Sequence, residues 1–382
     1  MGTHHHAPDR AGARLHRTAA LVVVAPLALL TVVALVWLWP SSGAIGDGST
    51  AAPEIPGRVV AVEEETCPDG TPEDVERCGT VRVSVGTVDP VEVTAPLPGG
   101  LGEPDVEVGE DVVMIRNETP DGVSYAVVDH QRQTGLWFLG LAFVLALVAF
   151  GRWRGVASLA GLAATFAILA FFVVPAILDG SPPLLVAVVA SSAIVLVVLY
   201  LTHGFGLTTT MAVLGTLAAL ALTGALGALS VTLLHLTGVT DDLSASVGAS
   251  QGVDMRGLLL AGIVIGSLGV LDDVTVTQAA TVEEIAHADP SAGFARLFRA
   301  GSRVGRAHVA SVVNTIVLAY AGSSLPLLVL LVADNGSLTA VVPSQVVAQE
   351  IVRSVVATIG LIAAVPLTTA LAAWAHRSRL VS

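Results

Sequence analysis

Two adjacent aspartates, Asp272 and Asp273, stand inside an apolar stretch that begins at Gly257. Moving a carboxylate from water to the centre of a membrane costs about 2.5–3.5 kcal/mol on insertion scales. Successive side chains of a helix point about 100° apart, so rotating the helix cannot turn both aspartates away from lipid. We therefore expect both to face the inside of a helix bundle, against water or an ion. Paired carboxylates in that setting favour the binding of a proton or a small cation.

Further polar side chains continue along the same helix towards its inner end: Thr275, Thr277, Gln278, Thr281, Glu283 and Glu284. We expect them to form one polar stripe, with Asp273 as the ion ligand and Asp272 sharing its charge. Thr277 and Asn314 would add neutral oxygens, and Glu284 would lie at the inner surface. The alternative is a polar cluster that only holds helices together, although Ser, Thr and Asn are the usual residues for that role.

The composition indicates an integral membrane protein, with 53% hydrophobic and only 13% charged residues. An apolar run of about 20 residues can span the hydrocarbon region as a helix. Eight runs approach that length: 19–39, 135–150, 156–178, 184–201, 208–236, 257–280, 308–332 and 351–375. They predict an all-α bundle of about eight transmembrane helices. Pro326 predicts a break in the seventh run. The basic segment 291–306 predicts an amphipathic helix lying on the inner leaflet.

The arginines predict how the chain crosses the membrane. All 18 basic residues are arginine, and those outside 42–133 fall mainly in loops that alternate threading puts on one side. Basic loops face the cytoplasm, so both termini are expected there, in a bacterial plasma membrane. Residues 1–18 and 376–382 would be cytoplasmic tails, and 135–375 would hold the seven remaining helices. The first run, 19–39, could instead be a cleaved signal peptide, but its length favours a retained anchor.

Residues 42–133 predict a separate extracytoplasmic domain. Five short alternating runs separated by Gly- and Pro-rich turns favour a small all-β, barrel-like fold. Nineteen acids against five arginines make this region strongly acidic, which excludes nucleic acid as a partner. Its two cysteines, Cys67 and Cys78, are expected to form a disulfide, because disulfides persist outside the cytoplasm. Without a histidine nearby they do not suggest a zinc site.

Enzyme motifs were not found in the sequence. The chain has no lysine, so it cannot contain a phosphate-binding Gly-Lys loop, and no serine-hydrolase elbow or zinc-protease motif occurs. We expect neither catalysis nor a cofactor. Glu284 and His287 have the spacing of carboxylate metal sites in helical bundles, but a second copy is lacking. Whether a metal binds there stays open.

Three stretches resemble the YibE/F family of bacterial multi-pass membrane proteins: "LGVLDDVTVTQAATVEEI", "VGRAHVASVVNTIVLAYAGSSLPLL" and "EIVRSVVATIGLIAAVPLTT". The resemblance runs from about Pro56 to Ala373, and Asp273, Glu284 and Asn314 fall at positions of the family pattern. Asp272 and Gln278 depart from that pattern, which makes Asp273 the stronger candidate. The resemblance implies a membrane protein for which transport is suspected, and it supplies no substrate.

These observations favour a transporter or channel that moves a small cation or solute across the lipid bilayer. The rival hypothesis is a scaffold or regulator that engages an envelope protein through the β domain, with the acids serving assembly. A homo-oligomer is compatible with either. The sequence does not identify the substrate, the direction of transport, the oligomeric state or a partner protein.

Overall fold

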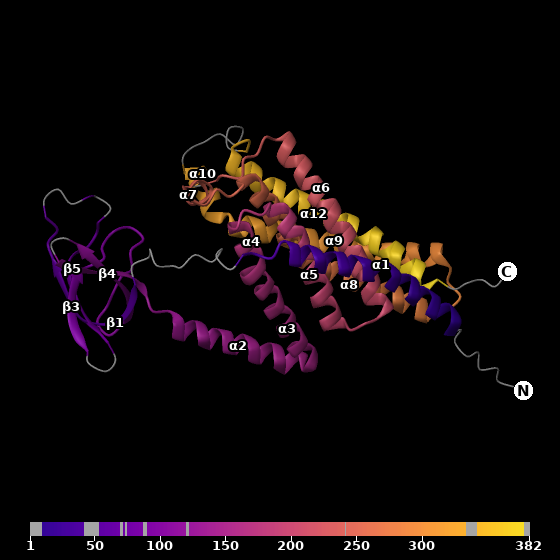
Figure 1. Cartoon of the computed structure of the whole chain (residues 1–382), viewed down its shortest axis with the longest axis horizontal. Coiled ribbons are helices and arrows are strands. Elements are labelled where there is room, and N and C mark those ends of the chain that lie inside the picture. The colour runs from indigo at the N-terminus through magenta and orange to yellow at the C-terminus, as the bar shows by residue number, and fades with distance from the viewer. Residues whose placement is uncertain are drawn as a thin grey trace, which may run out of the picture. The chain divides into compact units, whose positions relative to one another are not determined.

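The computed structural model of the chain describes residues 10–41, 53–68, 72, 75–86, 90–119, 122–240, 242–333 and 342–377. The chain divides into two compact units, each with its own hydrophobic core (Figure 1). The helical unit comprises Met1–Ile45 and Gly151–Ser382, and the sheet unit comprises Gly46–Phe150.

The sheet unit contains a five-stranded antiparallel sheet with the strand order β3-β2-β1-β4-β5. Its elements are β1 Glu54–Glu65, β2 Cys78–Val85, β3 Val91–Pro96, β4 Asp111–Thr119, β5 Gly122–His130 and the following helix α2 Gln133–Gly151. The strands coincide with the five predicted runs, because alternation places every second side chain on one face. Val59, Val81 and Met114 fill the core at 1% exposure or less. The edge strands β3 and β5 also contact each other, so the sheet curls towards the predicted barrel.

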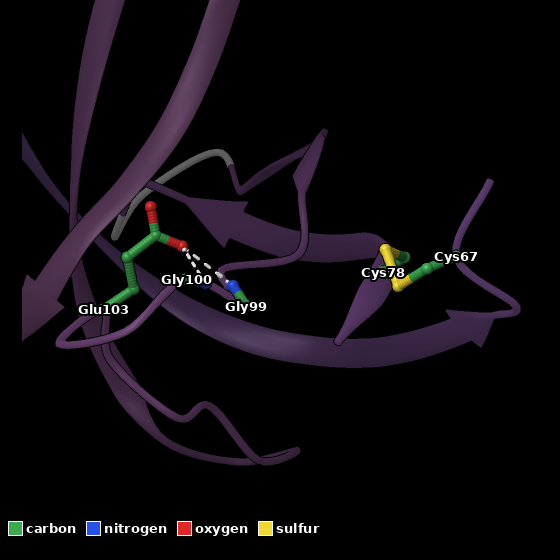
Figure 2. Close-up of a disulfide and its surroundings, with 5 residues drawn as sticks. All are labelled: Cys67, Cys78, Gly99, Gly100 and Glu103. Carbon is green, nitrogen blue, oxygen red and sulfur yellow. Dashed lines mark hydrogen bonds between the residues drawn. A yellow bond between two sulfur atoms is a disulfide. The ribbon is translucent and has the colours of Figure 1, made fainter. Parts of the chain in front are cut away.

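A disulfide and a carboxylate hold the loops at one side of this sheet. Cys67 is bonded to Cys78 at the start of β2, the pair that the sequence predicts (Figure 2). The Glu103 carboxylate accepts hydrogen bonds from the backbone N–H groups of Gly99 and Gly100, at 2.8 and 2.9 Å. These bonds favour the ionised form and hold the pKa of Glu103 below its ordinary value.

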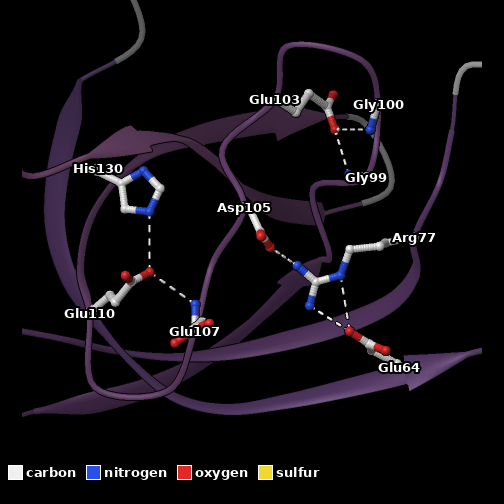
Figure 3. Close-up of polar contacts among 9 residues, drawn as sticks. All are labelled: Glu64, Arg77, Gly99, Gly100, Glu103, Asp105, Glu107, Glu110 and His130. Carbon is white, nitrogen blue, oxygen red and sulfur yellow. Dashed lines mark hydrogen bonds and ion pairs between the residues drawn. The ribbon is translucent and has the colours of Figure 1, made fainter.

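Ion pairs link neighbouring segments of the same sheet unit (Figure 3). Arg77 pairs with Glu64 of β1 at 2.5 Å and also with Asp105 in the loop before β4. His130, at the end of β5, contacts the Glu110 carboxylate at 3.1 Å. All the acids of these pairs are well exposed, so each pair contributes little stability by itself.

The helical unit is a bundle of long apolar helices (Figure 1). Its elements are α1 Arg10–Trp37, α3 Trp153–Ile168, the π-helical turn Leu169–Val173, α4 Val174–Leu178, α5 Pro183–His203, α6 Leu207–Leu233, α7 Asp242–Gln251, α8 Met255–Ala288, α9 Phe294–Ser323, α10 Leu325–Ala333 and α12 Gln345–His376. Because α3, the π-helical turn and α4 follow one another without a gap, together they form the predicted span 156–178.

Seven helices in the described part of the chain are long and apolar enough to cross a membrane, and one of them is α2 of the sheet unit. The remaining predicted span lies in α1, whose segment Val22–Trp37 is a shorter apolar helix. All eight predicted runs are therefore helical, and the number that cross the membrane stays a prediction.

Three helices, α6, α8 and α12, pack against one another at the centre of the bundle. Between α6 and α12 the contact is reciprocal. A Cβ atom on Gly215 of α6 would overlap the Thr368 hydroxyl of α12, and a Cβ atom on Gly360 of α12 would overlap the Thr223 hydroxyl of α6. The absence of both side chains lets the two backbones approach closely, as small residues do in membrane helices.

The seventh predicted run is broken where the sequence indicates. Helix α9 ends at Ser323 and α10 begins at Leu325, one residue before Pro326. The segment 291–306, predicted to be an amphipathic helix on the inner leaflet, forms the start of α9, which is continuous from Phe294 to Ser323. Its first part packs into the bundle, and the buried Gly301 and Gly305 allow the close approach. Leu297 is fully buried and Phe298 packs against the same core cluster, so the apolar side of this segment contacts the bundle.

Candidate functional site

Helix α8 carries both aspartates into the wall of one cavity, which we call the aspartate cavity. It has a volume of about 710 Å³ and lies between α3, α5 and α8. Asp272 is half-buried and Asp273 is exposed to the cavity side of the helix. The helix turns its apolar positions Leu271 and Val274 into the core, where each is 1% exposed. This orientation leaves the carboxylates on the side that faces α3 and α5.

The opposite walls of the aspartate cavity are also polar. Helix α3 contributes Arg154, Ser158 and Thr165, and helix α5 contributes Thr202 and His203. With a neutral histidine, the two aspartates and the one arginine leave a single net negative charge in the cavity. One monovalent cation or one proton would neutralise it.

The two threonine hydroxyl groups in this wall already donate their protons to backbone carbonyls. Thr165 donates to the Gly161 carbonyl at 3.0 Å, and Thr202 donates to the Val198 carbonyl at 2.7 Å. A hydroxyl has one proton, so these oxygens present only lone pairs to other groups. The Thr202 oxygen also lies 2.7 Å from His203 Nδ1, which makes Nδ1 the proton donor and leaves Nε2 as the acceptor of a neutral ring.

A smaller cavity of about 310 Å³ adjoins the first one, and we call it the adjoining cavity. It shares His203 and Val276 with the aspartate cavity and extends along α8 to Glu283. Thr208 also lines it and lies 3.3 Å from His376 Nε2, at the end of α12. Polar groups thus run from the aspartates to the end of the bundle where α5 and α12 finish and α6 begins.

The other predicted site residues lie elsewhere. Thr277 and Glu284 are exposed on α8, and Asn314 is exposed on α9. None of the three lines the aspartate cavity or the adjoining cavity. Their roles in binding stay predictions.

The expected single polar stripe along α8 is wrong. Thr275 turns to α6, where its hydroxyl lies 2.6 Å from that of Thr216. Gln278 is 3% exposed and turns to the other side, donating to the Gly301 carbonyl at 2.9 Å and to the Thr369 hydroxyl at 2.8 Å. Gln278 therefore joins α8, α9 and α12 through buried hydrogen bonds.

Sequence reasoning missed Arg154 and His203 as site residues. Arg154 served only to predict the topology, and His203 lies just beyond the predicted span 184–201. The available signal was a polar residue at one end of each neighbouring apolar run. In the described part of the chain, no cluster of three or more His, Cys, Asp or Glu residues could hold a metal ion. This includes the surroundings of Glu284 and His287.

Comparison with known proteins confirms the family resemblance for the helical part of the chain, whereas the resemblance of the strands after Pro56 lies outside the match and stays a prediction. The sequence profile of the family described as YibE/F-like protein matches residues 139–378, which is more than half of the chain. The match includes both cavities and every helix from α3 to α12. No curated protein and no solved structure matches the chain significantly.

Proposed function

Because the chain belongs to the YibE/F-like family, and its helical unit is built for a membrane, we propose that it moves a small cation across the lipid bilayer. Asp273 binds the cation, Asp272 shares its charge, and Arg154 limits the net charge of the site. The observation that carries this proposal is the presence of both carboxylates in one polar cavity between apolar helices.

Several features of the site favour a cation over an anion. Carboxylates outnumber fixed positive charges in the aspartate cavity, and the threonine oxygens have donated their protons to backbone carbonyls. An anion would face two carboxylates and few free donors. A cation would meet oxygen atoms that carry lone pairs, which are the ligands that hard cations prefer.

The placement of the cavities supports an approach from the cytoplasm. The aspartate cavity lies at the end of the bundle where Arg154 stands in the first turn of α3 and α5 ends with His203. The same end holds His376, the last residue of α12, and it is the arginine-rich end of the helices. Basic residues favour the cytoplasmic side, so the cation would reach Asp273 from there.

The test is a measurement of ion-jump currents from the purified full-length protein in proteoliposomes adsorbed on a supported membrane. Protons, sodium, potassium, magnesium and manganese are applied in turn. Wild type is compared with Asp273→Asn, after both are shown to be equally folded and reconstituted. Glu54→Gln, which removes an exposed carboxylate at the start of β1, is the matched control.

We expect a current with at least one cation, its loss in Asp273→Asn and its retention in Glu54→Gln. Equal currents in wild type and Asp273→Asn would exclude the aspartate cavity as the binding site. Silence from well-folded wild type with every cation would overturn the proposal and favour the scaffold hypothesis. Capture of an envelope protein by the sheet unit would then be the next experiment.

A further inference from the structure

A third cavity lies between α8, α9 and α12, and we call it the tyrosine cavity. Its volume is about 310 Å³. It is lined on α8 by residues from Gly266 to Leu271, whereas the aspartate cavity begins at the next residue, Asp272. The two cavities therefore meet at one level of α8 but lie against different neighbouring helices.

Three hydroxyl groups make this otherwise apolar cavity suitable for a cation. Ser267 donates to the Val264 carbonyl at 2.9 Å, and Ser323 donates to the Tyr320 carbonyl at 2.8 Å, so both oxygens offer lone pairs to the cavity. The Tyr320 hydroxyl is the third. A Cβ atom on Gly266 would lie 3.2 Å from it, so the glycine leaves room beside that hydroxyl.

An ion pair on α12 lies close to the same tyrosine. Arg353 and Glu350 form the i,i+3 salt bridge that their spacing predicts, at 2.8 Å, and the charges of both act on the Tyr320 phenol. Both residues are in the first turns of α12, at the end of the bundle opposite to Arg154 and His203. The tyrosine cavity therefore lies towards the end of the bundle that the arginine distribution predicts to be extracytoplasmic.

Three buried apolar residues line the tyrosine cavity, and we call them the apolar barrier. Leu271 is 1% exposed, Ile316 of α9 is 4% exposed and Leu361 of α12 is 0% exposed, and all three belong to the main core of the helical unit. The barrier at Leu271 is one residue from the carboxylate of Asp272.

We propose that the tyrosine cavity is the outer half of the ion path, entered from outside by the same small cation, and that Leu271, Ile316 and Leu361 close it from the aspartates in the state observed here. The identity of the cargo rests on the proposed function. The position of the two cavities on different sides of α8 does not depend on which ion is carried. The access of water to each cavity can therefore be measured separately.

Cysteine labelling tests this directly, because the only two cysteines of the chain form a disulfide and leave no free thiol. Full-length Ser323→Cys and Ser267→Cys report on the tyrosine cavity, Ser158→Cys on the aspartate cavity and Leu271→Cys on the barrier. Each is exposed to a membrane-impermeant, thiol-reactive maleimide from one side of the membrane. Ser192→Cys on α5, which lines neither cavity, is the matched negative control. Val108→Cys in the sheet unit, 63% exposed in wild type, identifies the outer side.

We expect labelling of the cysteines at 323 and 267 from the side that labels the cysteine at 108, and labelling of the one at 158 from the other side. The cysteine at 271 should react from neither. Protection of the cysteines at 323 and 267, while the one at 108 reacts, would overturn the inference even if wild type carries a current. Conversely, labelling as expected from a protein that carries no current would retain the two half-paths and reject cation transport.

Discussion

The reciprocal contact between α6 and α12 leads to a stability prediction that a double-mutant cycle can test. A Cβ atom on Gly360 would overlap the Thr223 hydroxyl, so Gly360→Ala must push the two helices apart or force Thr223 into another rotamer. Overpacking of this kind costs about 1–3 kcal/mol. The better helix propensity of alanine returns up to about 1 kcal/mol, so we expect a net loss of roughly 1–2 kcal/mol.

Removing the threonine should restore most of that loss. In Thr223→Ala the hydroxyl and methyl groups are gone, and the closest remaining atom is the residue 223 Cβ, 3.2 Å from the new methyl. That contact is tight, but a shift of a few tenths of an ångström relieves it. The double variant should therefore be more stable than Gly360→Ala alone, with a coupling energy of about 1–2 kcal/mol.

The assay is unfolding of the purified full-length protein by sodium dodecyl sulfate in mixed micelles, followed by the fluorescence of its five tryptophans. Gly262→Ala on α8 is the matched control, since no atom lies within 4 Å of the added methyl group. Its free energy of unfolding should lie within about 0.5 kcal/mol of the wild-type value. The packing argument fails if Gly360→Ala is as stable as wild type, or if the double variant is no more stable than Gly360→Ala.

Four further predictions concern single side chains. Gln278→Leu should destabilise the bundle by about 1–3 kcal/mol in the same assay, because the Gly301 carbonyl and Thr369 hydroxyl lose a buried donor; unchanged stability would mean that the three-helix contact is unimportant. Replacing Cys67 and Cys78 by serine should make the loop between them more sensitive to protease, and equal digestion would contradict the staple role. The folded-state pKa of Glu103 lies below that of the unfolded chain, so its ionised form adds stability above the unfolded pKa, and this contribution disappears as the pH falls through the folded pKa. Amide exchange of residues 97–105 should accordingly be slower in wild type than in Glu103→Gln at neutral pH and equal at low pH, whereas a constant difference would refute it. Finally, Arg154→Gln should raise the ratio of divalent to monovalent cation currents in the ion-jump assay, because the aspartate cavity becomes more negative by one charge. An unchanged ratio would show that the charge of Arg154 does not affect the cation.

The secondary structure could be predicted from the sequence because each strand alternates apolar and polar residues and each predicted helix contains a long apolar run. Alternating valines located the five strands, and hydropathy located the eight helical runs, including the break beside Pro326. What the sequence could not supply was the neighbour of each helix face. The spacing of residues on α8 fixes the angles between their side chains, but it does not show that Asp273 faces α3 and α5 while Gln278 faces α9 and α12.

The same limit explains why the sequence alone could not assemble the site. The ligand role of Asn314 stays a prediction, and in the structure this residue is exposed on α9 and does not line the aspartate cavity. Arg154 and His203 belong to separate helices and lie at the ends of their apolar runs, where a polar residue is ordinary. Only the packing of α3 and α5 against α8 makes them part of one cavity.

The contacts of α8 also show which parts of the bundle are held together by buried polar groups. Thr275 is hydrogen-bonded to α6, and Gln278 is hydrogen-bonded to α9 and α12, so rotating α8 would leave buried polar groups without partners. Gly215 and Gly360 further hold α6 against α12. In contrast, α9 beyond Ile316 is largely exposed and ends in a break, and α3 faces α8 across the aspartate cavity. Helices α6, α8 and α12 are therefore the most closely joined helices of the described bundle, whereas the last turns of α9 are more loosely packed.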